Sequence, residues 1–551
     1  MILYYRMEKL IRLFRICFAC LFIVITIYGS GKVRAEGNSA GETVRQATIV
    51  ISYTRYEWWL LRWSDNQIVC QVFIDHEGWP TVDDVLTDCG GTIYDQWLAT
   101  QACTGLDQGF LLPSNCTGLY LFFIGSAPAE KEIKINLPPA QVFISLSGCN
   151  PIAPENLCPI IPKLHIVGDE PLPNEQITAI HVKMDGIETT CQGSTCDVQL
   201  RPTRLVGTTV EFWADSSFGD SSTIFTAMVR VIDSGVSVSP TSGGWYVDVI
   251  STQWQGNEIA TCAQVWQAFP PVGGVPDWLS TPEDPAFLAT EEPFAYLAGR
   301  LITQGVVNAS SCSGGGLLSN GYADNCGLDL AMPKVIIWQN QFDDQIMQVA
   351  KDTKVPAQLL KNLFAQESQF WPGVFRKPNE FGLGQITDNG ADALLLWNPS
   401  FFNQFCPLIL TEDQCKAGYL KLDAANQALL RGALATSADA DCENCEYGID
   451  LTSIDTSIDL VAHTLLANCE QVAQIVYNAT GQIAGEVSSY EELWKFTIAD
   501  YHTGPGCLSY AMYTAWAARA TMDWDHVSTY LTDPCETVIP YVTEIISSPQ
   551  E

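Results

Sequence analysis

The stretch NLFAQESQFWPG, residues 362–373, puts a glutamate where the periodicity of a helix would place another leucine. Four residues follow the i, i+3, i+4, i+7 spacing of one helical face: Leu360, Leu363, Phe364 and Glu367. This face is expected to be the buried one, because Lys361 and Gln366 fall on other sides of the helix. Glu367 is therefore predicted to end an apolar stripe.

The residues before this stretch supply a helix start. Pro356 suits the first helical turn, and Asp352 or Thr353 is available as a cap. The apolar stripe therefore belongs to a helix that begins near Pro356.

A carboxyl group on an apolar stripe has a specific chemical use. Desolvation disfavours its charged form and raises its pKa, so that it can hold a proton near neutral pH. Cleavage of a glycosidic bond requires such an acid, because the departing oxygen must be protonated. The helix alone leaves a second interpretation open, in which Glu367 reaches past Phe364 to solvent.

The first 35 residues predict export. Four basic residues precede or enter the apolar run ICFACLFIVITIY: Arg6, Lys9, Arg12 and Arg15. Val33 and Ala35 then occupy the small-residue positions of a signal-peptide cleavage site, with the cut expected after Ala35. The alternative is an uncleaved membrane anchor, for which the apolar run is short. The mature chain is therefore expected to be secreted or to lie at the cell surface.

Cysteine content agrees with export. Of the 20 cysteines, Cys17 and Cys20 lie in the leader, which leaves an even number in the mature chain. An exported chain with many cysteines is expected to form structural disulfides. The sequence does not say which cysteines pair.

The net charge of the chain limits the kinds of molecule that it is expected to bind. The leader holds six basic residues and one acidic residue, so its removal takes the net charge from −34 to −39. A field of this sign repels nucleic acid and anionic membranes. A neutral or amphoteric polymer held by aromatic faces and hydrogen bonds is the expected partner.

The pattern along the chain predicts a multidomain protein, with β-rich modules before an α-helical domain. Strand-like runs broken by cysteine-rich turns fill residues 36–160, and a pattern that resembles a small immunoglobulin-like sandwich covers 161–233. A linker with loops and short helices is expected over 234–334, starting with DSGVSVSPTSGG. Helical periodicity dominates 335–535, and 536–551 is expected to be a tail.

Three sequence blocks resemble those of the soluble lytic transglycosylases, lysozyme-like enzymes that cleave peptidoglycan. They are AQES, EFGLGQIT and, far downstream, FTIADYHTGPG. Glu367-Ser368 matches the family's glutamate-serine pair at the end of a helix. Gly382, Leu383 and Gln385 match its Gly-Leu-Met-Gln block, with Gly384 in the methionine position. The resemblance covers roughly residues 335–530, and it is the order and spacing of the blocks that make it specific.

The third block matches in part. Tyr501 and Gly504 match the family's Ala-Tyr-Asn-x-Gly block, but His502 replaces the asparagine and Asp500 the alanine. Arg376 stands where members commonly carry a serine. These departures affect how the sugar's N-acetyl and hydroxyl groups are held.

The resemblance implies a single-carboxylate mechanism without a cofactor. Glu367 is the acid that protonates the β-1,4 linkage between N-acetylmuramic acid and N-acetylglucosamine, and Tyr501 donates a hydrogen bond that holds it. The expected product is a 1,6-anhydromuramoyl end. Six residues are expected to bind the glycan: Ser368, Gly382, Leu383, Gln385, His502 and Gly504.

Two alternatives remain. A second carboxylate that positions water, from Asp388, Asp392 or Asp500, would make the protein a hydrolase like goose-type lysozyme. The alternative from another functional class is a domain that binds glycan without cleaving it, because a fold can be retained after its catalytic activity is lost.

No metal site is predicted. Cys442-x-x-Cys445 lacks the second cysteine pair of a zinc ribbon, so a disulfide is the preferred interpretation. The acidic run around it, from Asp439 to Asp450, lacks the glycine of a calcium loop. His463 is expected to be a core residue, and His181 an outward-facing strand residue.

Overall fold

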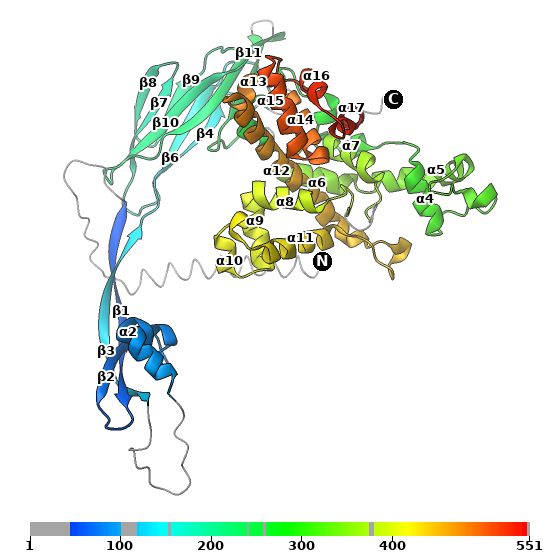
Figure 1. The fold of residues 1–551 in the computed structure, drawn as a ribbon. Helices are drawn as coiled ribbons and strands as arrows, with labels where there is room; N and C mark the ends of the chain where they lie inside the picture. The colour runs from blue at the N-terminus through cyan, green and yellow to red at the C-terminus, as the bar shows by residue number, and fades with distance from the viewer. Residues whose placement is uncertain are drawn as a thin grey trace. The chain divides into compact units, whose positions relative to one another are not determined.

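The computed structural model describes residues 45–100, 118–151, 156–239, 242–256, 261–373 and 380–547. The predicted leader, its cleavage site at Ala35 and Arg376 lie outside these ranges. Within them, no helix is both long enough and apolar enough to cross a membrane. The chain is β-rich first and helical afterwards, as the sequence predicts (Figure 1).

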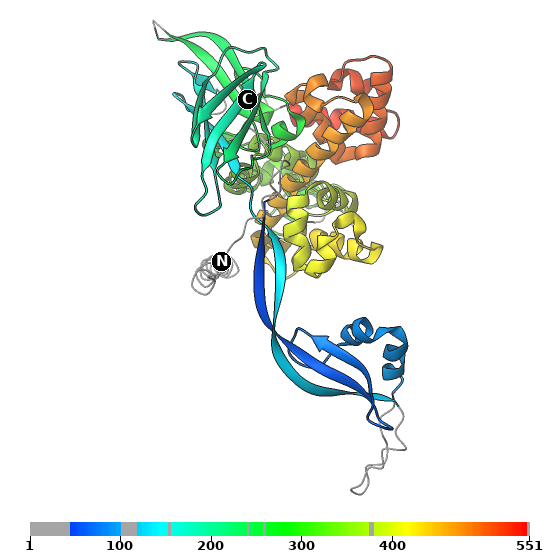
Figure 2. The same cartoon turned by 90° about the vertical axis from the view of Figure 1, so that its left-hand side faces the viewer.

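The first compact unit, whose described part lies mainly in residues 45–100 and 118–139, is built on a three-stranded antiparallel sheet in the order β2-β1-β3. Strands β1 (Gln46–Arg62) and β3 (Leu119–Asn136) pair over their whole length and form the long twisted ribbon of Figure 2. The strand β2 (Ile68–Ile74) joins only the later half of β1.

Helix α2 (Val82–Leu98) belongs to the same unit, although the sequence pattern predicts little helix there. A capping box between Thr81 and Asp84 starts this helix, and the Cys70–Cys89 disulfide ties it to β2. Because the helix covers the sheet through a small apolar cluster, its tertiary contacts outweigh its weak helical pattern.

The second unit begins with two sheets that share one core. A six-stranded sheet has the order β5-β12-β11-β10-β7-β8, and a three-stranded sheet has the order β4-β6-β9. Their bounds are β4 (Gln141–Ser147), β5 (Leu157–Cys158), β6 (Lys163–Asp169), β7 (Ile177–Met184), β8 (Ile187–Gln192), β9 (Thr195–Gln199), β10 (Thr208–Ser216), β11 (Phe225–Ser239) and β12 (Ser242–Ile250). Buried and exposed residues alternate along β6 and β10, which gives each strand one core face.

The predicted linker at residues 233–244 is wrong. Its residues extend β11 and start β12, with Asp233 opposite Trp245 and Ser237 opposite Gly243. Backbone pairing holds this hairpin together, so its serine-rich and glycine-rich composition does not prevent a strand.

The helical region begins at residue 261, earlier than the predicted change of period at 335. Its helices are α3 (Thr261–Trp266), α4 (Ala295–Thr303), α5 (Asn325–Asn340), α6 (Asp343–Thr353), α7 (Ala357–Ser368), α8 (Asp388–Trp397), α9 (Pro399–Phe405), α10 (Glu412–Lys416), α11 (Ala424–Ala438), α12 (Ile454–Thr480), α13 (Ala484–Val487), α14 (Tyr490–Thr503), α15 (Pro505–Ala517), α16 (Trp524–Val527) and α17 (Val538–Ile546). All share one apolar core, in which α12 packs against α3, α6, α8, α14 and α15.

Eight disulfides lie within the described residues, which confirms the predicted disulfide-rich character. The pairs are Cys70–Cys89, Cys149–Cys158, Cys191–Cys196, Cys262–Cys469, Cys312–Cys326, Cys406–Cys415, Cys442–Cys445 and Cys507–Cys535. Among them, Cys442–Cys445 confirms a disulfide rather than a zinc ligand pair. Disulfides in this number are consistent with an extracytoplasmic protein.

Candidate active site

Glu367 lies in the last turn of α7 and is half-buried. The predicted stripe beneath it is real, since Leu360, Leu363 and Phe364 are all fully buried. The start of α7 differs from the prediction, because Pro356 is the N-cap itself. The hydroxyl of Thr281, from a distant loop, accepts the N–H of Ala357 at 3.0 Å and so caps the helix.

The position of Lys361 in the sequence predicted a solvent-facing side chain, but in the structure this side chain is buried. It is 1% exposed, and its ammonium group donates to Oδ1 of Asp343 at 2.5 Å and to the carbonyl of Gln339 at 2.6 Å. Burial lowers the pKa of Lys361 and raises that of Asp343. Since the helix is buried on two sides, Glu367 is held on a well-supported segment.

The carboxylate of Glu367 receives a hydrogen bond from the hydroxyl of Tyr541, on α17. The ring of Tyr541 is 5% exposed and stacks on the imidazole of His502, with centroids 4.0 Å apart. Burial raises the pKa of the Tyr541 phenol well above its usual value, and the negative charge of Glu367 adds to the effect. Tyr541 therefore stays protonated and remains a donor to the acid.

Tyr501, on α14, lies in the same group but does not make the predicted bond. Its hydroxyl donates to the carbonyl oxygen of Gly384. Burial, followed by the charge of Glu367, raises its pKa well above the usual tyrosine value. The donor to Glu367 predicted from the sequence is therefore wrong, because the single phenolic proton of Tyr501 is directed at the backbone of the second block.

Tyr541 falls in the segment predicted as a tail and was missed. The signal was present, since Val538, Tyr541, Val542 and Ile545 repeat the i, i+3, i+4, i+7 spacing and are all buried. Helix α17 packs against both α7 and α14, which brings its tyrosine to the acid.

The block GLGQ forms a tight turn below Tyr501. Gly382 has φ +73°, and a Cβ there would meet Ser457 Oγ at 2.4 Å and the carbonyl of Ala438 at 2.6 Å. The same Ser457 hydroxyl accepts the N–H of Leu383 at 3.1 Å. Helices α11 and α12 thus press on this turn, which only glycine can make so closely.

The surroundings of Gly384 leave no room for a side chain. A Cβ at this position would stand 2.4 Å from a methyl carbon of Val461 and 2.7 Å from the Tyr501 hydroxyl. The next residue, Gln385, is 6% exposed and donates from Nε2 to the carbonyl of Gly382 at 2.6 Å. Its Oε1 is buried without a partner in the described part of the chain.

The other predicted binding residues are placed less uniformly. Ser368 is fully buried, and its hydroxyl donates to the carbonyl of Phe364 within its own helix at 3.3 Å. Leu383 is fully buried as well. His502 is exposed beside Tyr541, and Gly504, at φ +75°, separates α14 from α15. Glu367, Tyr501, Gln385 and His502 thus belong to one region, whereas Ser368 faces the core.

The three carboxylates considered as water-positioning groups differ in their surroundings. Asp388 is exposed in the first turn of α8. Asp392 accepts hydrogen bonds from the Tyr419 hydroxyl and from Arg431, the latter at 2.9 Å. Asp500 is 1% exposed and accepts from Asn468 at 2.8 Å, and burial raises its pKa to about 7.

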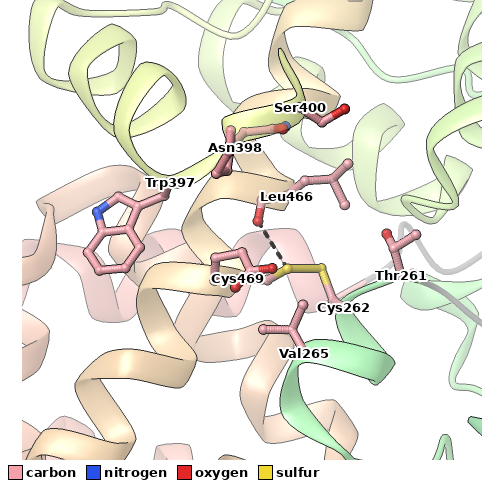
Figure 3. Close-up of a pocket in the computed structure, with 10 residues that line it drawn as sticks. Thr261, Cys262, Val265, Trp397, Asn398, Ser400, Leu466 and Cys469 are labelled. Carbon is pink, nitrogen blue, oxygen red and sulfur yellow. Dashed lines mark hydrogen bonds between the residues drawn. A yellow bond between two sulfur atoms is a disulfide. The ribbon is translucent and has the colours of Figure 1, made fainter. Parts of the chain in front are cut away.

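A separate cavity of about 210 Å³ lies between α3, α9 and α12. The Cys262–Cys469 disulfide forms part of its wall, with Leu466 and Thr261 beside it (Figure 3). None of the predicted site residues lines this cavity. Within the described ranges, no group of three potential metal-ligating side chains is found.

No protein family matches this sequence, and no curated protein does. Among solved structures, a polysaccharide lyase aligns with 78% of this chain and 53% of its own, at 10% identity and a TM-score of 0.15. The aligned part is thus about half of that lyase. A likeness this small carries no argument about fold or function.

Proposed function

We propose that this protein is an exported lytic transglycosylase that cleaves the glycan strands of peptidoglycan. In this proposal the helical region is a lysozyme-like catalytic domain and the two-sheet sandwich is an immunoglobulin-like module. Glu367 is the catalytic acid, and no cofactor takes part.

One observation supports the proposal above the others: the first two motifs and a third one, more than 100 residues downstream, meet at Glu367. The acid ends α7, and Tyr501 comes from α14. The hydroxyl of Tyr501 donates a hydrogen bond to the carbonyl oxygen of Gly384 in the second block, and the charge of Glu367 helps to raise the pKa of Tyr501. A carboxylate, two buried phenols and a glycine turn thus lie together. Such a grouping is expected of an active site, and the packing of the core alone does not require it.

The chemistry follows from a single acid. Glu367 gives its proton to the linkage oxygen as the C1–O bond of the muramoyl residue breaks. The substrate's own N-acetyl group stabilises the developing cation at C1. The ionised Glu367 then takes the proton of the muramoyl 6-hydroxyl, whose oxygen bonds to C1. The 6-hydroxyl competes well with water, because it is tethered close to the reacting carbon.

The position of Tyr541 suits this cycle. A phenol that stays protonated can donate to Glu367 in its ionised state and release it when the acid is protonated. Tyr501 acts one step away, by fixing the turn that carries Gln385. Tyr541 is thus a positioning residue for the acid. Tyr501 is a positioning residue for Gln385, which is expected to bind the glycan.

The product distinguishes this proposal from the hydrolase. Asp392 is engaged by Arg431 and Tyr419, and Asp500 is sealed from solvent, so neither is free to orient bulk water. These two placements favour the anhydro product, whereas Asp388 is exposed, so the product has to be identified directly. Purified sacculi should be digested with the protein and the fragments weighed: a mass lower by one water than that of the reducing-end product supports the lyase, and reducing ends would favour the hydrolase.

The non-catalytic alternative has its own test. If the domain only grips glycan, the wild-type protein will cosediment with sacculi and release no soluble fragments over hours. Release of fragments by the wild type and none by Glu367→Gln, with both proteins still cosedimenting, supports the enzyme.

A further inference from the structure

Polar groups without partners gather around Gly373, six residues after Glu367 in the sequence. Four side chains meet there and are called the Gly373 cluster: Arg300, Trp371, Gln385 and Asp441. All belong to the second unit. Three of them hold a buried polar atom that has no hydrogen-bond partner in the described part of the chain: Arg300 Nε, Trp371 Nε1 and Gln385 Oε1.

Short distances tie the cluster together. The guanidinium carbon of Arg300 lies 4.7 Å from the centre of the Trp371 ring. A Cβ added to Gly373 would stand 2.9 Å from Trp371 Nε1 and 2.2 Å from Asp441 Oδ1. On the other side, Gln385 Nε2 lies 3.5 Å from the carbonyl oxygen of Gly373. Donors and acceptors from four segments thus surround one glycine.

The backbone after Glu367 places this cluster. Gln369 and Phe370 both adopt left-handed conformations, with φ +48° and +62°, and turn the chain back at the end of α7. Oε1 of Gln369 accepts the N–H of Tyr296 at 2.8 Å, at the start of α4. Arg300 stands one turn further along α4, so the residues that follow the acid also fix the arginine.

Unpartnered buried polar atoms lower the stability of a folded protein, because they lose their hydrogen bonds to water. Three in one place are unusual in a folded protein and call for an explanation, such as a water molecule, an ion or a ligand that binds there. Arg300 adds a further cost, because it forms no salt bridge within the described residues, although the chain carries 62 acidic side chains against 28 basic ones. A ligand that satisfied these atoms would recover part of this free energy.

The mixture of groups defines the ligand. Arg300 and Trp371 only donate, whereas Gln385 Oε1 and the carboxylate of Asp441 only accept. A carboxylate ligand would face two acceptors, and an ammonium ligand would face the guanidinium. A secondary amide carries one acceptor and one donor on a flat apolar frame, and it fits both halves of the cluster.

We propose that the Gly373 cluster is a subsite for a secondary amide of the glycan strand. This proposal rests on the proposed function, because peptidoglycan carries such amides on its sugars as acetamido groups and on its stem peptides. A chain of contacts connects this subsite to the acid through Tyr501. Gln385 follows Gly384, whose carbonyl oxygen receives the Tyr501 hydroxyl.

Binding separates this proposal from catalysis. Affinities should be measured calorimetrically in the Glu367→Gln background, at high salt to screen charge attraction. Two ligand pairs distinguish the amide sources. One pair is the N-acetylglucosamine tetramer and its de-N-acetylated form. The other is the muramoyl disaccharide with and without a dipeptide.

Trp371→Phe removes the indole donor and keeps most of the ring. We expect it to weaken binding of the amide-bearing member of one pair about fivefold, the value of one hydrogen bond, and to leave the amide-free member unchanged. Loss of discrimination in the tetramer pair assigns the acetamido group, and loss in the disaccharide pair assigns the peptide. Arg300→Gln should act in the same direction.

Trp338→Phe is the matched control. Trp338 stacks on Trp371 at 5.4 Å, but its N–H already donates to the carbonyl of Phe370 at 2.9 Å. This variant should lower thermal stability and keep the amide preference. The proposal is overturned if the parent shows no preference in either ligand pair, or if Trp371→Phe and Arg300→Gln retain the full preference. It is equally overturned if Trp338→Phe abolishes the preference to the same extent. These outcomes do not depend on turnover.

Discussion

The hydroxyl of Tyr541 donates a hydrogen bond to the carboxylate of Glu367, across 174 positions of sequence. The phenol comes from the last helix of the described chain and the acid from the end of α7. Because α17 packs against both α7 and α14, the hydrogen bond is set by the helical core and not by a surface loop. The orientation of the acid therefore depends on the C-terminal helix.

Removing this hydroxyl should reduce turnover and leave the fold intact. Tyr541→Phe keeps the ring that stacks on His502 but loses a hydrogen bond to a charged group, worth about 1.5–3 kcal/mol. We expect the rate of sacculus digestion to fall roughly ten- to a hundredfold, with a lower midpoint of thermal unfolding and the fold retained. Tyr510→Phe, at an exposed tyrosine on α15, is the control. Equal rates for Tyr541→Phe and wild type would show that this bond does not orient the acid.

A methyl group at Gly384 should disturb the acid through Tyr501. The added carbon of Gly384→Ala would lie 2.4 Å from Val461 and 2.7 Å from the Tyr501 hydroxyl. We expect a loss of about 1–3 kcal/mol in the free energy of unfolding and a lower turnover rate. Gly432→Ala, in helix α11 with nothing within 4 Å, should instead stabilise by about 0.5–1 kcal/mol. If Gly384→Ala changed neither the free energy of unfolding nor the turnover rate, the turn would have to move freely to make room for the methyl group.

Asp500 predicts a pH dependence of stability. Its pKa is raised from 3.8 to about 7 in the folded state because it is buried. The folded protein therefore binds more protons than the unfolded chain between about pH 4 and pH 7. The contribution of Asp500 to stability is fully present below pH 4 and is lost as pH rises through 7, by about 4 kcal/mol in all.

Denaturant unfolding of Asp500→Asn across this pH range checks the sign. The fall in the free energy of unfolding with rising pH should be smaller in the variant. At pH 8 the variant should be the more stable protein, because an amide avoids the cost of a buried charge. Parallel curves for the two proteins would contradict the assignment.

The Cys262–Cys469 disulfide should be a main stabilising link of the helical region. It joins α3 to α12 across 207 residues, whereas Cys442–Cys445 spans 3. In the chain-entropy account, the longer loop is worth up to about 5 kcal/mol and the shorter about 1.5 kcal/mol. Replacing both cysteines of each pair with alanine and comparing thermal unfolding tests this ranking. A larger loss from the Cys442–Cys445 pair would reverse it.

The apolar stripe of α7 was predictable, because Leu360, Leu363 and Phe364 interact with the core through local spacing alone. Lys361 was not, because its burial depends on Asp343, a partner supplied by another helix. An isolated lysine in a helix pattern is expected to face solvent. Only the tertiary structure shows that it closes a buried ion pair.

Composition concealed regular structure in two other segments. The segment after residue 233 is rich in serine and glycine, yet Val236 and Val238 alternate within it as strand residues do. Tyr541 lies on a helical stripe in what was predicted to be a tail. In both cases the local pattern held a signal, and short length together with turn-forming neighbours concealed it.

The sequence did not allow the roles of the individual tyrosines to be predicted. Tyr501 was expected to hold Glu367, since it is the tyrosine of the third block. The structure directs its proton to Gly384 and gives the contact with the acid to Tyr541. Which of two phenols donates to a carboxylate depends on helix packing to within an ångström, and no spacing rule sets that.

Release of dye from labelled sacculi by the wild type and by Glu367→Gln tests the central claim most directly. Glu544→Gln, at an exposed glutamate on the same helix as Tyr541, is the matched control. We predict rapid release by the wild type and by Glu544→Gln, and none above background by Glu367→Gln. Digestion by Glu367→Gln at a rate near that of the wild type would contradict the account.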